Sequence, residues 1–178
     1  MKFTSAGMKD LWLIEPTVFP DNRGYFFEGF NKQIFEANTN LNIDFVQDNE
    51  SKSTKGVLRG MHFQRGRYAQ AKLVRVLQGE VQDVVVDLRE GSTSYGKHYS
   101  VILSGENRKQ LFIPRGFAHG FLVLSDTAIF SYKCDNYYNK ESEGGLLYNC
   151  PKLAISWKLT DQELKLSEKD LVLSCFEG

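Results

Sequence analysis

Three groups of residues in this sequence have the types and spacing to carry chemistry, and the densest surrounds His62. A guanidinium, that of Arg59, precedes this imidazole in a stretch whose apolar residues would exclude water. The structural alternative is a hydrogen-bonded core histidine beside solvated arginines. Residues three apart lie on opposite faces of a regular strand, so a site shared by Arg59 and His62 requires a bulge or turn near Gly60.

The second group is a turn leading into a strand, with the spacing P-x-G-x-x-H at Pro114, Gly116 and His119. This spacing resembles the second cupin motif, whose histidine is a ligand in metal-binding cupins. The partner motif in those proteins supplies H-x-H, whereas this chain has His62-Phe63-Gln64. Because an amide replaces an imidazole and the chain has only three His, we expect a cupin-like shape and no metal.

The third group is an aromatic segment with Tyr132, Tyr137 and Tyr138. Such tyrosines either fill a core with the hydroxyl at its rim, or present a buried phenol that donates a proton or stacks on a ring. Four more polar residues border apolar segments and, taken alone, are ordinary strand-edge residues: Arg23, Glu28, Gln47 and Asn49.

Strands must position these groups, because 13 Phe, 8 Tyr and 15 Gly favour strands separated by turns. Residues 72–88 form two β-rich runs around Gln78-Gly79-Glu80, which is typical of a hairpin. Alternation places Lys72, Val74 and Val76 on one face of the first run. Further strands are predicted at residues 12–15, 24–30, 58–64, 97–103, 110–113, 120–124 and 128–133, a spacing typical of a sandwich or barrel.

Helical signals are short and peripheral. Asn31 is placed to cap a helix over residues 32–37, and Thr160 with Glu163 has the spacing of a capping box. The chain has no internal repeat and no Pro- or Ser-rich linker. We therefore expect residues 1–178 to form one domain.

Charge and cysteine usage exclude several classes of protein. The 178 residues include 22 Lys+Arg and 22 Asp+Glu, so no broad positive field favours nucleic acid or anionic membranes. Cys134, Cys150 and Cys175 form no CxxC pair, which predicts neither a disulfide framework nor a zinc site and favours a reducing compartment. Charged residues interrupt the first 16 positions, unlike a signal peptide, and no stretch is long enough to span a membrane. These features predict a cytoplasmic protein.

Together, the segments resemble the dTDP-4-dehydrorhamnose 3,5-epimerase family over essentially the whole chain. That resemblance implies an all-β fold, a cupin-type double-stranded β-helix (jelly roll) with short peripheral helices. The motifs that carry it are Asp21-Asn22-Arg23-Gly24, Phe45-Val46-Gln47-Asp48-Asn49, Val57-Leu58-Arg59-Gly60-Met61-His62, Ala69-Gln70-Ala71-Lys72-Leu73-Val74, Gly79-Glu80-Val81, Val86-Asp87-Leu88-Arg89, Ile113-Pro114-Arg115-Gly116-Phe117-Ala118-His119-Gly120-Phe121, Tyr137-Tyr138 and Leu166-Ser167-Glu168-Lys169-Asp170.

The resemblance implies a cofactor-free inversion of C3 and C5 of dTDP-4-dehydro-6-deoxy-D-glucose, which gives dTDP-4-dehydro-L-rhamnose. Each inversion removes a proton alpha to the C4 ketone and returns one from the opposite face. By resemblance, His62 is the base, Asp170 is the carboxylate that orients it, and Tyr132 is the acid on the far face. Lys72 matches the cation near the C4 oxygen, where a charge stabilises the developing enolate.

Substrate binding is implied for eight further residues, and the family is implied to be homodimeric. Arg59 and His119 match positions near the phosphates and sugar, and Tyr138 matches the aromatic residue at the nucleobase and sugar. Lys169 matches a phosphate contact. Four more match positions that hold the nucleotide, some reaching across a dimer interface: Arg23, Glu28, Gln47 and Asn49.

The chain departs from the family pattern at three places. Arg67-Tyr68 stands where many members have a Pro, Asn149-Cys150-Pro151 replaces Asn-Asp-Pro, and Ser156-Trp157-Lys158 replaces Trp-Pro. The last change affects the tail that must deliver Asp170. Three alternatives stay open: an epimerase acting at C3 or C5 only, a 3,4-ketoisomerase of the same fold, and a cupin that binds a sugar nucleotide without catalysis.

Overall fold

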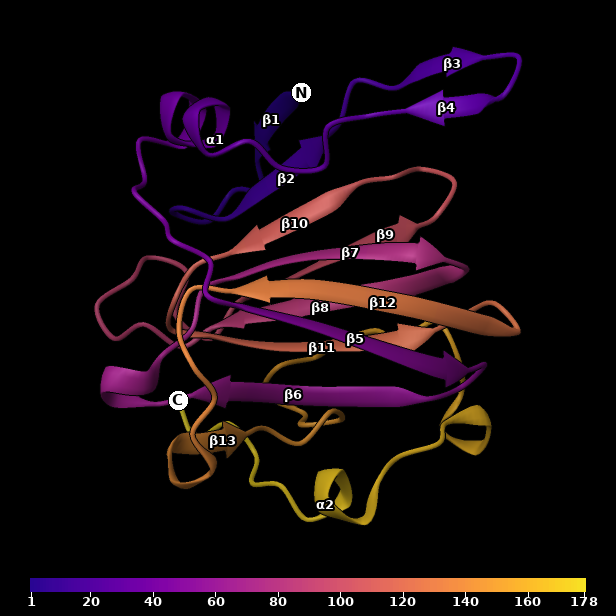
Figure 1. Ribbon diagram of the computed structural model, residues 1–178. Coiled ribbons are helices and arrows are strands. Elements are labelled where there is room, and N and C mark those ends of the chain that lie inside the picture. Colours follow the sequence, from indigo (N-terminus) through magenta and orange to yellow (C-terminus); the bar gives the residue numbers. More distant parts are fainter.

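The computed structural model describes residues 1–178 and consists mainly of β-strands (Figure 1). The prediction of an all-β fold with short peripheral helices is confirmed. The strands are β1 (Lys2–Ser5), β2 (Trp12–Glu15), β3 (Phe19–Asp21), β4 (Gly24–Phe26), β5 (Gln47–Thr54), β6 (Leu58–Gln64), β7 (Lys72–Gln78), β8 (Glu80–Asp87), β9 (His98–Ser104), β10 (Gln110–Ile113), β11 (Phe117–Val123), β12 (Thr127–Cys134) and β13 (Glu143–Gly145); the α-helices are α1 (Lys32–Thr39) and α2 (Glu168–Leu171).

Two antiparallel sheets face each other and enclose the main core. One has six strands in the order β1-β2-β10-β7-β12-β5, and the other has five in the order β13-β6-β11-β8-β9. A separate two-stranded hairpin, β3-β4, projects from one end of the molecule (Figure 1). The predicted strand over residues 24–30 is shorter than expected, because only Gly24–Phe26 pairs, within this hairpin.

Alternation along the facing strands decides what lies between the sheets. In β7, Val74 and Val76 belong to the core, as predicted, and Lys72 follows the same alternation. In β8, the residues Val81 and Val85 face this core. The space between the sheets is therefore largely apolar, with polar side chains inserted at particular strand positions.

The predicted hairpin at Gln78-Gly79-Glu80 is wrong. Both runs are strands, but β7 pairs with β10 and β12, whereas β8 pairs with β9 and β11. Gly79 is the point where the chain crosses from one sheet to the other. Its φ of +81° favours glycine, and a Cβ there would lie 2.1 Å from the carbonyl oxygen of Thr127. A glycine turn suits a hairpin or a crossing, and the long-range partners decide between them.

Both predicted capping signals are present. The Asn31 side chain accepts a hydrogen bond from the backbone N–H of Ile34 at the start of α1, which extends two residues further than expected. Thr160 and Glu163 form the capping box of a short 3-10 turn, Asp161–Glu163. Two more such turns lie at Gly66–Tyr68 and Lys140–Ser142.

The prediction that no cysteines pair is wrong, because Cys150 and Cys175 form a disulfide with Cα atoms 5.2 Å apart. The two are 25 residues apart in sequence and meet because the C-terminal segment returns to the region after β13. The backbone N–H of Leu147 donates to the carbonyl of Ser174 in the same contact. Spacing alone does not reveal a pairing that depends on the path of a tail.

Candidate functional site

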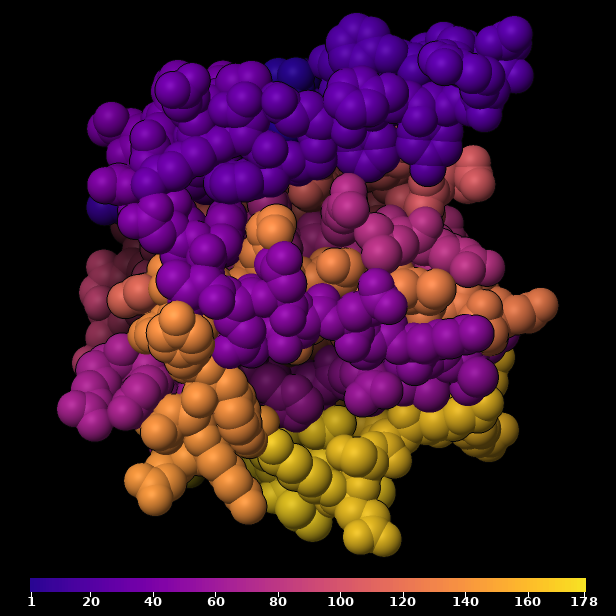
Figure 2. Space-filling view, in the orientation of Figure 1, coloured from indigo at the N-terminus to yellow at the C-terminus, as the bar shows by residue number.

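Two cavities open into the barrel and meet at three of the predicted catalytic residues. One encloses about 490 Å³ and the other about 290 Å³. The surface is hollowed between β5, the segment after β12 and the C-terminal segment, which is yellow in Figure 2. Both cavities are lined by His62, Lys72 and Tyr132.

His62 lies on β6 and is paired with Asp170. Its Nε2 is 2.6 Å from Asp170 Oδ1. Burial opposes charge on Asp170, but hydrogen bonds from His62 and Ser167 outweigh it and hold the pKa of the Asp170 carboxyl below its usual value. A carboxylate only accepts hydrogen bonds, so Nε2 carries the proton and Nδ1 is the ring nitrogen that can act as a base.

The tail delivers Asp170 in spite of its unusual sequence. Residue Lys165 pairs with the chain just before β6, since its N–H donates to Gly56 and its carbonyl accepts from Leu58. The segment Ser156-Trp157-Lys158, which replaces the family's Trp-Pro, is fixed by the side-chain amide of Gln82. This amide donates to the carbonyl of Ser156 and accepts from the backbone N–H of Lys158.

The opposite wall of the cavities carries Tyr132 on β12 and Lys72 on β7. These strands are neighbours in the six-stranded sheet, and Lys72 Nζ lies 5.7 Å from the centre of the Tyr132 ring. Burial raises the pKa of the Tyr132 phenol, so the hydroxyl keeps its proton at neutral pH. Burial also lowers the pKa of the Lys72 ammonium, against the attraction of acidic groups that include Asp83 and Glu143.

Arg59 shares the larger cavity with His62, which confirms the irregularity predicted at Gly60. His62 pairs with His119 of β11, and Arg59 pairs with Phe121, so two residues of β6, Gly60 and Met61, lie opposite one residue of β11, Gly120. The Gly60–Met61 peptide bond within this bulge is cis. A Cβ at Gly60 would lie 2.5 Å from the Cα of Gly120, so the close approach requires glycine.

His119 lines the larger cavity and is paired with a residue that the sequence analysis did not single out. Its Nε2 lies 2.9 Å from Oδ2 of Asp83, which is 0% exposed on β8. The second oxygen, Oδ1, has no hydrogen-bond partner. Burial raises the pKa of the Asp83 carboxyl, although His119 acts in the opposite direction. The sequence could have indicated Asp83, because it is an acidic residue within the otherwise uncharged strand segment Val81-Gln82-Asp83-Val84-Val85.

Gln47 and Asn49 lie on β5, a strand that the sequence analysis did not predict. Both side chains line the smaller cavity. The Gln47 amide donates to the Asn49 side chain at 3.0 Å and accepts from the backbone N–H of Tyr138 at 3.2 Å. This strand has alternating exposure but polar residues on both faces, so hydrophobic periodicity does not reveal it.

Tyr138 and Lys169 meet at Glu143, a second residue that the sequence analysis missed. The Tyr138 hydroxyl donates to Glu143 Oε2 at 3.0 Å, and the Lys169 ammonium donates to Oε1. Although burial opposes it, these hydrogen bonds keep the pKa of the Glu143 carboxyl below its usual value. Lys169 lines the larger cavity, and Glu143 and Tyr138 line the smaller one.

Arg23 and Glu28 lie outside both cavities. Arg23 is at the turn of the projecting β3-β4 hairpin and bonds to Asp21, and Glu28 accepts a hydrogen bond from Asn31. The single chain therefore brings together ten of the twelve residues predicted for the site. No group of three or more His, Cys, Asp or Glu side chains is arranged to hold a metal ion. None of the helices is both long and apolar enough to cross a membrane.

A base and a proton donor on opposite walls, with a cation beside them, can remove a proton from one face of a bound carbon acid and return one to the other. A jelly-roll barrel with this interior defines a cupin-type isomerase. The family model described as dTDP-4-dehydrorhamnose 3,5-epimerase matches residues 5–177. The chain belongs to this family, as the sequence resemblance predicted.

Individual relatives agree with this assignment. A dTDP-4-dehydrorhamnose 3,5-epimerase of Escherichia coli is 54% identical over 170 residues, which cover 96% of this chain and 91% of the relative. The crystal structure of the epimerase from Elizabethkingia anophelis is 57% identical with a TM-score of 0.96, covering 99% of this chain and 96% of that one. The epimerase from Legionella pneumophila, solved with dTDP-4-keto-L-rhamnose, is 48% identical with a TM-score of 0.93, covering 98% and 92%.

Proposed function

We propose that this protein is an epimerase that inverts C3 and C5 of dTDP-4-dehydro-6-deoxy-D-glucose and forms dTDP-4-dehydro-L-rhamnose. The observation that carries the proposal is the position of the His62–Asp170 pair and of Tyr132, on facing sheets around shared cavities. Relatives at about half identity over most of the chain bear the name of this activity. The reaction only moves protons, so it balances without a redox cofactor.

In the first half of each inversion, His62 takes the proton alpha to the C4 ketone. Nδ1 accepts it, and the electron pair of the broken C–H bond moves onto the C4 oxygen as an enolate. Asp170 stabilises the imidazolium that forms, and it keeps the ring in the reactive tautomer beforehand. The Lys72 ammonium lies where it can meet the enolate oxygen, and its charge contributes most in the transition state.

In the second half, Tyr132 returns a proton to the opposite face of the same carbon. Its phenol suits this role because burial raises its pKa and keeps it protonated. Solvent restores the phenol proton and removes the one on His62. The same two groups serve C3 and C5, provided that the sugar presents each carbon to them in turn.

The two cavities suit the two halves of the substrate. Arg59, whose Nε donates to Ser53 Oγ, presents a guanidinium fork to phosphate oxygens, and His119 lines the same cavity. Gln47, Asn49 and Tyr138 line the smaller cavity, where amides and an aromatic ring suit a nucleoside.

We also propose that residues 1–178 act as one domain in a homodimer, in which each copy supplies Arg23 and Glu28 to the other's site. The support is that the β3-β4 hairpin projects from its own barrel and exposes three aromatic rings. Exposed apolar side chains of this kind mark interfaces. Sedimentation as a monomer at micromolar concentration would contradict this proposal. The exposed rings are Phe19 at 58%, Tyr25 at 56% and Phe26 at 68%.

A cytoplasmic location remains part of the proposal, since a soluble sugar nucleotide is the substrate. Neutral net charge gives no support to binding of nucleic acid or membrane. The Cys150–Cys175 disulfide argues in the other direction, because cytosolic thiols are kept reduced in most organisms. Alkylation of the protein as it is extracted from its own cells would report which state it has there.

The function is tested by incubating the protein with dTDP-4-dehydro-6-deoxy-D-glucose in deuterated water and following C3 and C5 by NMR. Label at both carbons, with the product trapped by a rhamnose-forming reductase, is the expected result. Label at one carbon would identify a mono-epimerase. The absence of label at both carbons would indicate that the substrate is another sugar nucleotide or that the protein binds without catalysis. His62→Ala should abolish exchange at both carbons, whereas Tyr132→Phe should spare some exchange but impair inversion.

A further inference from the structure

The β3-β4 hairpin and the residues that follow it form an arm, residues 19–29, that has few bonds to its own barrel. The hairpin is a separate two-stranded sheet, so no backbone ladder joins it to the two barrel sheets. Two hydrogen bonds tie the arm to the rest of the chain: the Gln110 side chain donates to the carbonyl of Gly29 at 2.8 Å, and the Asn31 side chain donates to Glu28 at 3.2 Å. Cavities of about 400 Å³ and 200 Å³ are lined by residues of both the arm and the six-stranded sheet. The position of the arm therefore depends on a few side chains.

Two arginines of the barrel reach aromatic rings of the arm. The guanidinium carbon of Arg108 lies 4.1 Å from the centre of the Tyr25 ring. Arg108 belongs to the turn between β9 and β10, which lies beneath the hairpin in Figure 1. The guanidinium carbon of Arg75, on β7, lies 5.7 Å from the centre of the Phe27 ring, and Arg75 lines both cavities. A cation over the face of an aromatic ring is attracted to it, so both contacts hold the arm against the barrel.

Nothing else in the structure accounts for an arginine at position 108. The ion pairs of the chain leave both arginines without a carboxylate partner, and Arg108 Nε is buried without a hydrogen-bond partner. The backbone of Arg108 has a φ of +53°, a conformation that glycine and asparagine adopt more readily. The turn itself is fixed by Ser104 and Asn107, which exchange hydrogen bonds. The Arg108 side chain therefore serves its contact with the arm and not the turn.

We propose that Arg108 and Arg75 are positioning residues that act on the active site of the other subunit, because they hold the arm in the orientation in which it delivers Arg23 and Glu28. The inference rests on the proposed homodimer, since Arg23 and Glu28 lie outside both active-site cavities of their own chain. An arm without these contacts has many orientations and must be ordered when the substrate binds, which weakens binding.

The first variant is Arg108→Asn, because asparagine tolerates the left-handed backbone and lacks the guanidinium. KM for label exchange at C3 and C5 should rise about tenfold, the effect of losing a partly desolvated contact between a cation and a ring. The acid and base lie on the barrel, so kcat should stay close to the wild-type value. Lys97→Asn is the matched control, since it removes the same charge from an exposed position, and it should leave KM unchanged. Arg75→Gln should also raise KM, and it carries the test if Arg108→Asn does not fold.

Mixed dimers identify the site that the arm serves. Two chains with different tags are coexpressed, and the dimers that carry both tags are purified. When one chain has Arg108→Asn and the other has His62→Ala, the one active site with a base receives an unaltered arm, so KM should return to the wild-type value. When one chain carries both substitutions and the other is wild type, the active site receives the altered arm, and KM should stay raised.

The opposite assignment of the two KM values would show that Arg108 serves the site of its own chain. A wild-type KM in the Arg108→Asn homodimer would show that this residue does not position the arm, and either result would overturn the proposal. Failure of the proposed function has a different signature. A wild-type protein that sediments as a monomer would contradict the homodimer, and one that exchanges no label would contradict the activity.

Discussion

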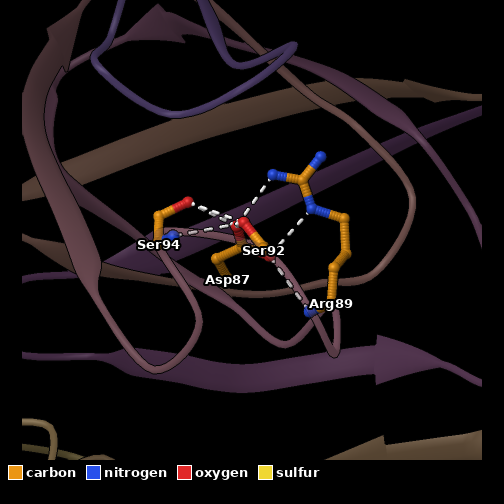
Figure 3. A network of polar contacts seen from close by, with 4 residues as sticks. All are labelled: Asp87, Arg89, Ser92 and Ser94. Atoms are coloured by element: carbon orange, nitrogen blue, oxygen red, sulfur yellow. Dashed lines mark hydrogen bonds and ion pairs between the residues drawn. The ribbon is translucent and has the colours of Figure 1, made fainter.

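Two carboxylates on β8 are equally buried but have very different hydrogen-bond partners. Asp83 and Asp87 are both 0% exposed. Asp87 accepts hydrogen bonds from the Arg89 backbone and guanidinium and from the hydroxyls of Ser92 and Ser94 (Figure 3). Asp83 has one partner, His119, and one oxygen with none.

Their pKa values follow from these partners. At Asp87 the donors outweigh burial and lower the pKa of the carboxyl, whereas at Asp83 burial dominates and raises the pKa. Asp87 braces the loop between β8 and β9 and stabilises the fold. Asp83 lacks such donors, lies behind the cavity and acts on Lys72 and His119. A buried carboxylate with a full set of donors is typical of a structural role, whereas a buried acid with a raised pKa beside a cavity is a candidate for a functional role.

The largest effect is expected from Asp87→Ala. This change leaves the Arg89 guanidinium and two serine hydroxyls without their acceptor, and breaking such a buried pair costs about 3 to 5 kcal/mol. The free energy of unfolding should fall by that amount in urea titrations, while exchange activity per folded molecule stays close to wild type. A variant of normal stability would show that the network is not a brace.

The braced loop also supports the C-terminal tail, because the ring of Tyr95 packs on Phe176 at 5.3 Å between centroids. Phe176 follows Cys175, so the disulfide fixes the same region. Cys175→Ser removes a cross-link between residues 25 apart and should lower the free energy of unfolding by about 3 kcal/mol.

A dithiol reductant should have the same effect on the wild-type protein and none on Cys175→Ser, which serves as the control. Activity should change little, since Asp170 is held by His62 and by the pairing of Lys165. A large loss of kcat in Cys175→Ser would show instead that the disulfide positions Asp170.

Asp83→Asn should reverse the pattern of Asp87→Ala. Stability should stay within about 1 kcal/mol, because an amide avoids the cost of a buried charge while still bonding to His119. The exchange rate should fall about 100-fold, since the variant removes the negative charge that acts on Lys72. Rates at C3 and C5, together with urea titrations, check both parts; a destabilised variant of normal kcat would contradict the functional role.

The difference between these two acids also shows what the sequence can predict. The order of the motifs along the chain predicted the catalytic residues His62, Tyr132, Lys72 and Asp170, because each lies in a recognisable segment. Asp83 was missed because its importance lies in what it lacks, a second hydrogen-bond donor, which depends on neighbours from other strands.

The same distinction separates the parts of the fold that the sequence predicts from those that it does not. Strands with apolar alternation were predicted, but β5 was missed because its polar residues are stabilised by pairing with β12. The turn at Gly79 was located correctly, yet its partners were wrong, because local sequence does not specify which sheet a strand joins. Glu143 was missed for the same reason, since its donors come from distant segments.

The smallest effect, and the one that separates the two acids by sign, is the pH dependence of stability. Asp87 has a lowered pKa, so it contributes stability above the unfolded value of about 4 that is lost as the pH falls through its folded pKa. Asp83 has a raised pKa, so its contribution is present below about 4 and is lost as the pH rises through its folded pKa.

Between pH 7 and pH 3, Asp87→Asn should therefore lose less stability than the wild type, and Asp83→Asn should lose more. Each difference should be on the order of 1 kcal/mol, because only part of each titration falls in this range. Urea titrations at four pH values measure it. Parallel curves for the two variants would mean that the two carboxyls do not differ in proton affinity, and the distinction between brace and functional acid would then rest on kinetics alone.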